Sequence, residues 1–92
     1  MTAAKNLTSA QRKHGTRLWA NLDAAHTAVY QGATDTPFNE ALSIAPRNLV
    51  AAYTDALSAL SEYEYELVAQ GRGYFDRNGH FAETGTVTSP WL

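Results

Sequence analysis

Apolar residues recur at helical spacing in two long stretches of the chain. The first stretch predicts a helix from about residue 9 to residue 31, with an inward face of Leu18, Leu22, Ala25 and Val29. Gly15 interrupts the apolar pattern of this helix and lowers its stability by about 1 kcal/mol relative to Ala. The second stretch predicts a helix from about residue 46 to residue 70, with a face of Leu49, Val50, Tyr53, Leu57, Leu60 and Leu67. Glu64 is the conspicuous polar residue on that face. We expect the two helices to pair antiparallel, with Leu57 in the buried seam.

Local signals mark where the helices begin and end. Thr8 and Gln11 have the Thr-x-x-Gln form of a capping box, which predicts the start of the first helix. Gly32 is expected to end it with a left-handed residue. Pro37 and Pro46 each occupy a position where a helix tolerates the missing N–H group. They predict a short helix over 37–44 and the start of the second long helix.

The run from Ser61 to Leu67 alternates polar and apolar residues and could also form a strand. Helical spacing continues on both sides of this run, and the whole stretch is too long for a typical strand. We therefore interpret it as part of the second long helix.

A different pattern begins at Gly71. Tyr74-Phe75 and His80-Phe81 flank a connection that ends in Asn78-Gly79, which predicts a small β-hairpin. The segment from Tyr74 to Gly85 resembles one repeat of the choline-binding and glucan-binding proteins of cell surfaces, with Tyr-Phe-Asp-x-Asn-Gly followed by an apolar residue and Thr-Gly. Those repeats form their sites between successive copies, whereas this chain has one copy and lacks the Trp before the Tyr. The resemblance therefore implies a hairpin rather than a sugar or choline site.

Together these patterns predict a mainly α fold: an antiparallel pair of long helices with a short intervening helix, then a small β-hairpin and an extended C-terminal arm. With 92 residues the chain has room for one domain, which we divide into an N-terminal arm (1–8), a helical core (9–70) and the hairpin and arm (71–92). So small a core often gains stability from oligomerisation.

Composition narrows the classes of function. Because Cys is absent, disulfides and Cys-based zinc sites are excluded. The net charge of −2 gives the chain no general attraction to nucleic acid or anionic membranes. No apolar run is long enough to span a bilayer, and the N-terminus lacks the apolar core of a signal peptide. We expect a protein that is not secreted by a signal peptide and is cytoplasmic or assembled in a particle such as a virion.

The chain contains no recognisable catalytic motif. It has no Gly-x-Ser-x-Gly elbow, and the Gly71-Arg72-Gly73 run follows a helix rather than opening one, so it is not a phosphate-binding loop. A metal site would require histidines to converge with carboxylates such as Asp23 or Glu64, and the interpretation we prefer is that the histidines have surface or packing roles. We expect no enzyme activity and no cofactor or metal.

Basic residues cluster near the N-terminus. Arg12, Lys13 and Arg17 could contact phosphate, which would make the chain a binder of nucleic acid or of a phosphorylated ligand. The alternative is intramolecular pairing with an acidic cluster on the second long helix. This cluster consists of Glu62, Glu64 and Glu66. We favour the intramolecular alternative.

Aromatic residues and the C-terminal arm suggest contact with other chains. The candidate partner-binding residues are Trp91, Leu92, Val87, Tyr63 and Tyr65. We expect residues after Gly85 to contact a neighbouring subunit, although Trp91 could instead cover the chain's own core. The predicted function is a non-enzymatic structural or interaction subunit of a homo-oligomer or hetero-assembly, for example a small virion accessory protein. The alternative is a small regulatory or inhibitory binder of nucleic acid or a phosphorylated ligand.

Overall fold

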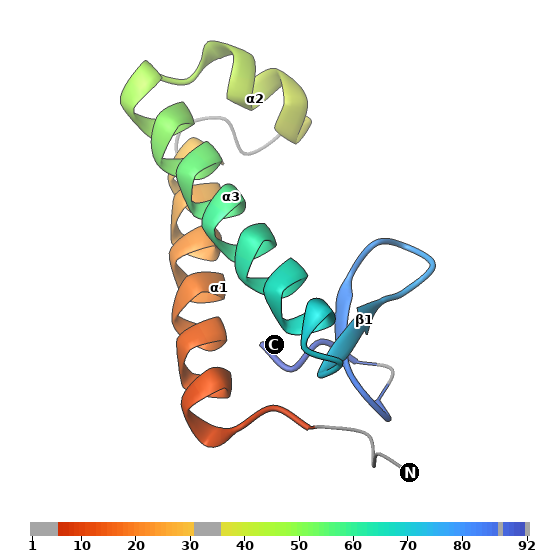
Figure 1. The fold of residues 1–92 in the computed structure, drawn as a ribbon. Helices are drawn as coiled ribbons and strands as arrows, with labels where there is room; N and C mark the ends of the chain where they lie inside the picture. Colours follow the sequence, from red (N-terminus) through yellow and green to blue (C-terminus); the bar gives the residue numbers. More distant parts are fainter. Residues whose placement is uncertain (1–5, 31–35, 87, 92) are drawn as a thin grey trace, which may run out of the picture.

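The chain forms three helices followed by a two-stranded antiparallel hairpin. A computed structural model describes residues 6–30, 36–86 and 88–91. Its elements are α1 (Ser9–Tyr30), α2 (Phe38–Ile44), α3 (Arg47–Ala69), β1 (Gly73–Phe75) and β2 (Phe81–Glu83). Helices α1 and α3 lie side by side, α2 lies at one end of the pair and the hairpin at the other (Figure 1). The predicted mainly α fold, with its pair of long helices and its C-terminal hairpin, is confirmed.

The start of α1 is a capping box, as the sequence predicts. The Gln11 amide N–H donates to Thr8 Oγ1 at 3.1 Å, and the Thr8 N–H donates to Gln11 Oε1 at 2.9 Å. Each side chain thus satisfies a backbone N–H that has no partner inside the helix. The predicted stop at Gly32 lies outside the described residues.

Proline and glycine set the limits of α3. The Pro46 carbonyl accepts hydrogen bonds from the N–H groups of Leu49 and Val50, so the helix starts directly after this proline. At the other end, Gly71 has a φ of 76°. The Gly71 N–H donates to the Val68 carbonyl and the Arg72 N–H donates to the Leu67 carbonyl. This pair of bonds is the Schellman motif, in which Gly supplies the left-handed residue that turns the chain into β1.

The hairpin connection is organised by Asp76. Its carboxylate accepts hydrogen bonds from the backbone N–H groups of Asn78 and His80, both at 2.9 Å, and Gly79 has a φ of 80°. Strand pairing places Phe75 opposite Phe81. Local turn chemistry therefore holds the short strands in register, as the Asn-Gly signal predicts.

The main core lies at the end of the helix pair away from α2, where the hairpin and Trp91 pack against the helices. It consists of Leu7, Leu60, Leu67, Phe81 and Trp91. Trp91 is only 3% exposed and its ring stacks on Phe81, with centroids 5.5 Å apart. The expectation that residues after Gly85 leave the helices for a neighbouring subunit was wrong for Trp91. A large aromatic ring gains more by filling the core of its own thin helix pair than by staying in water.

Leu57 corrects the predicted helix seam. Its side chain is 41% exposed, whereas Leu60 and Leu67 on the same helix are buried. The hairpin and Trp91 cover α3 only near its C-terminal half, and Leu57 lies beyond the edge of that cover. Helical periodicity placed Leu57 correctly on the face of α3 that includes Leu60 and Leu67. The segments that bury those two residues do not extend far enough along α3 to bury Leu57.

A second cluster of rings joins the helices at the other end of the molecule. His26 stacks on Phe38 with ring centroids 4.2 Å apart, and Tyr53 packs edge-on against Phe38 at 5.0 Å. Tyr30 completes the cluster. These contacts attach α2 to α1 and α3, since a helix of seven residues has little stability alone.

Candidate functional site

A groove runs along the α1–α3 pair on the side where the hairpin packs. Its larger hollow has a volume of about 420 Å³. Trp19 and Leu22 of α1 form one wall, Leu57 and Glu64 of α3 the other, and His80 and Trp91 close one end. Hollows of this volume are within the range that holds ligands or anchor side chains.

A smaller hollow of about 220 Å³ continues the groove toward α2. The two hollows share Trp19 and Leu22, and the smaller one is also lined by Asp23, His26 and Tyr53. We call the two together the seam groove. It begins where the hairpin and the C-terminal residues pack on the helix pair and continues toward α2, and its lining includes the exposed Leu57.

Glu64 is the charged residue inside the larger hollow. Its Oε2 accepts a hydrogen bond of 2.9 Å from the indole Nε1–H of Trp91. Burial raises the pKa of the Glu64 carboxyl, while the hydrogen bond from Trp91 and the nearby His80 act in the opposite direction. The carboxyl therefore lies in an apolar environment with one oxygen fixed by Trp91.

Two tyrosines that the sequence singled out lie outside this groove's walls. Tyr63 packs edge-on against His14 with centroids 4.6 Å apart, and its hydroxyl donates to the Gln11 carbonyl at 3.3 Å. Burial raises the Tyr63 pKa, and Glu66 adds to this effect. Tyr65 is 67% exposed and rests against Phe75 at 4.8 Å. Tyr63 thus joins α3 to α1, and Tyr65 presents most of its surface to solvent.

The sequence also suggested three C-terminal residues as candidates for contact with a partner: Val87, Trp91 and Leu92. Trp91 is buried in the core and forms one end of the seam groove. Val87 and Leu92 lie outside the described residues. Trp91 therefore presents only a small part of its surface to the groove.

Arg12 pairs with a carboxylate that the sequence did not suggest. Its guanidinium contacts Glu83 Oε1 rather than the cluster of Glu62, Glu64 and Glu66. The same oxygen accepts the Leu7 N–H at 2.9 Å, and Glu83 as a whole is 5% exposed. The hairpin explains the difference, because β2 inserts Glu83 between the N-terminal segment and α1.

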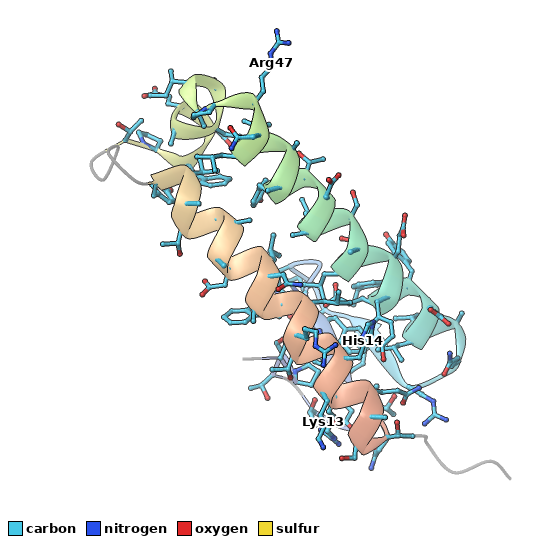
Figure 2. The ribbon with its side chains drawn as sticks, turned by 90° about the vertical axis from the view of Figure 1, so that its left-hand side faces the viewer. Lys13, His14 and Arg47 are labelled. Carbon is cyan, nitrogen blue, oxygen red and sulfur yellow. The ribbon has the colours of Figure 1, made fainter. Side chains whose placement is uncertain are left out.

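Lys13 and Arg17, the other two candidate phosphate contacts, lie one helical turn apart on α1. Lys13 and Arg17 are exposed on α1. Figure 2 shows Lys13 and Arg47 pointing away from the ribbon at opposite ends of the helix pair, with His14 turned toward α3. Arg12, the third candidate, is paired with Glu83, and contact of these three side chains with phosphate stays a prediction.

Within residues 6–30, 36–86 and 88–91, no group of three His, Asp or Glu side chains is placed to hold a metal ion. None of the described helices is both long and apolar enough to cross a membrane. The Asp76 carboxylate uses Oδ1 to accept hydrogen bonds from the two backbone N–H groups of the hairpin turn.

Comparison with protein-family models, with curated protein sequences and with solved structures found no match to this chain. The geometry of the chain itself therefore carries the functional argument.

Sequence reasoning missed the residues that form the groove as a site. Trp19 and His80 come from distant segments, and periodicity gives no sign that they line one hollow. Glu64 did carry a signal, since it is a carboxylate on an apolar helix face. Such a residue is expected to be partnered or functional.

Proposed function

We propose that this chain is a non-enzymatic interaction subunit that joins a larger protein complex or particle by accepting a helical segment of another protein in the seam groove. The observation that carries the proposal is the exposed Leu57 beside Trp19 and Leu22, in a hollow of about 420 Å³. Amphipathic helices commonly bind by placing apolar anchors into a groove between two helices of the partner.

The position of the groove supports this function. It continues the face that the hairpin and Trp91 cover, so a docked helix would extend the chain's own core rather than start a new one. A chain of this size has few buried apolar residues, and added apolar contact stabilises small domains.

The proposal is tested by photocrosslinking from the groove in the native source. A benzoylphenylalanine at position 57 is compared with one at Ala59, which is exposed two positions further along α3. We expect one dominant protein crosslinked from position 57 and not from position 59. That protein, once purified, should bind the wild type and lose at least about tenfold in affinity with Leu57→Lys, as expected for an interface anchor.

Ala59→Lys is the matched control, because it adds the same charge to the same helix outside the groove. Equal loss with both variants, or no crosslinked partner from position 57, contradicts the proposal. An affinity that falls steeply with salt and survives Leu57→Lys would instead favour the phosphate-binding alternative.

A further inference from the structure

Glu64 gives the seam groove a chemical preference, and this inference rests on the proposed function. The carboxylate lies in a hollow whose other walls include Trp19, Leu22 and Leu57. A carboxylate removed from water needs a hydrogen-bonding or charged partner, otherwise its ionised form is unfavourable. The residues around Glu64 therefore determine what kind of group can approach it.

Among residues 6–30, 36–86 and 88–91, one oxygen of the Glu64 carboxyl group has a hydrogen-bond partner. In the described part of the chain, Glu64 accepts its hydrogen bond from the Trp91 indole, through Oε2. The salt bridge found among these residues joins Arg12 to Glu83 and does not involve Glu64. His80 is the nearby group whose charge acts on the carboxyl. Oε1 thus has the capacity to accept a further donor from within the groove.

The geometry around Trp91 fixes the position of this carboxyl. The indole stacks on Phe81 with the ring planes 6° apart and packs tightly over Gly15. A ring that stacks on Phe81 and is in close contact with Gly15 cannot turn its N–H away without moving the core. Glu64 is therefore held at the wall of the groove rather than free to swing into solvent.

Charge distinguishes between the possible occupants. Asp23 lines the smaller hollow, so both hollows carry a carboxylate. A second copy docking groove to groove would bring these carboxylates toward the carboxylates of the other copy's groove, and like charges across an interface are unfavourable. A segment with a basic side chain would neutralise Glu64 instead.

We propose that the seam groove selects a partner helix that carries a Lys or Arg between apolar anchors, and that this cation pairs with Glu64. The apolar anchors fill the hollows beside Trp19 and Leu57, and the long aliphatic stem of the basic residue lies along the same apolar walls. The charged end then reaches the carboxylate within the groove, where a pair contributes more than it does in open solvent.

Two synthetic helical peptides test this selection. Both have the same amphipathic Leu and Ala stripe, and they differ only in a central Lys or Gln. The chain contains two Trp residues, Trp19 and Trp91, and both line the groove. Tryptophan fluorescence and the two indole N–H signals in NMR spectra therefore report occupancy directly.

We expect the Lys peptide to bind the wild type about tenfold more tightly than the Gln peptide, since an interfacial ion pair typically contributes on that scale. Glu64→Gln should bring the two affinities together while both peptides still bind. Glu62→Gln, which removes an exposed carboxylate from the same helix, should keep the preference.

The outcomes separate this inference from the function on which it rests. Equal binding of both peptides to the wild type, or a preference that survives Glu64→Gln, overturns the role of Glu64 and leaves the groove as a docking site. Failure of both peptides to perturb either indole contradicts the groove as a helix-binding site, and the inference falls with it.

Discussion

The Trp91 indole lies directly against the backbone of Gly15, so that a Cβ atom at position 15 would be 2.2 Å from the indole Cζ3. Gly15 is in the second turn of α1 and Trp91 is the second-last residue of the chain. This contact brings the C-terminal segment 88–91 against α1 and leaves no room for a side chain on the helix at position 15.

The contact reverses the usual effect of replacing a helical glycine. Gly→Ala inside a helix normally stabilises by about 1 kcal/mol, but Gly15→Ala should lower the free energy of unfolding by about 1–3 kcal/mol, because the methyl group forces Trp91 from its position. Urea denaturation measures the change, and Thr16→Ala at the next, exposed position is the control. In a Trp91→Ala background the effect should reverse, with Gly15→Ala stabilising by up to about 1 kcal/mol. Destabilisation of the same size in both backgrounds would show that Trp91 is not the obstacle.

The C-terminal residues should stabilise the isolated chain. Deleting residues 86–92 removes Trp91 from the core and exposes Phe81 and Gly15, so the melting temperature of the monomer should fall markedly. Truncating a buried Trp alone is typically worth about 3–5 kcal/mol. Circular dichroism melting at a concentration where the chain is monomeric measures this. An unchanged melting temperature would mean that the C-terminal residues act only in assembly.

Leu67 and Leu57 provide a matched pair on α3. Leu67 is 0% exposed in the main core, whereas Leu57 lies at the open groove. Leu67→Ala should cost about 2–5 kcal/mol of stability, the range for a buried leucine. Leu57→Ala should cost about 1 kcal/mol or less, because much of its side chain is already in water. Denaturant titration of both variants decides the point, and equal losses would mean that the groove is closed in solution.

Charge reversal should separate Arg12 from its neighbour Lys13. Arg12→Glu places a second carboxylate against the buried Glu83 and should lower stability by about 1–3 kcal/mol, because Glu83 loses its cation. Lys13→Glu, on the exposed side of α1, should change stability by no more than about 0.5 kcal/mol. Thermal melting at low and moderate salt compares the two. If both reversals are tolerated equally, the Arg12–Glu83 pair contributes nothing to the fold.

The raised pKa of Glu64 predicts how one variant depends on pH. Because the folded chain holds this proton more tightly than the unfolded chain, the stabilising contribution is complete below the unfolded pKa and is lost as the pH rises through the folded pKa. Glu64→Gln keeps an acceptor for the Trp91 N–H but has no carboxyl to ionise. Its melting temperature relative to the wild type should therefore rise between pH 4 and pH 7, with Glu62→Gln as the control. A constant difference across that range would contradict the burial of Glu64.

Short segments of the sequence are sufficient to specify the local structure of this protein. Three local features involve only residues a few positions apart, so a short segment contains all the groups that each one needs. They are the Thr8–Gln11 capping box, the proline at the start of α3 and the Asn78-Gly79 turn. Helical periodicity likewise placed Leu60 and Leu67 on the inward face, because the spacing of side chains around a helix is fixed.

The extent to which that face is buried depends instead on how distant segments pack against it. Trp91 turned back to Gly15, Arg12 found Glu83 rather than the acidic residues of α3, and Leu57 remained exposed. Each outcome depends on where the hairpin and the C-terminal segment pack, which brings together residues more than 70 positions apart. Periodicity cannot encode such contacts, because it specifies the face of a helix but not the extent of what packs against it. The seam groove forms, with Glu64 in its lining, because the hairpin and Trp91 pack along only part of the helix pair.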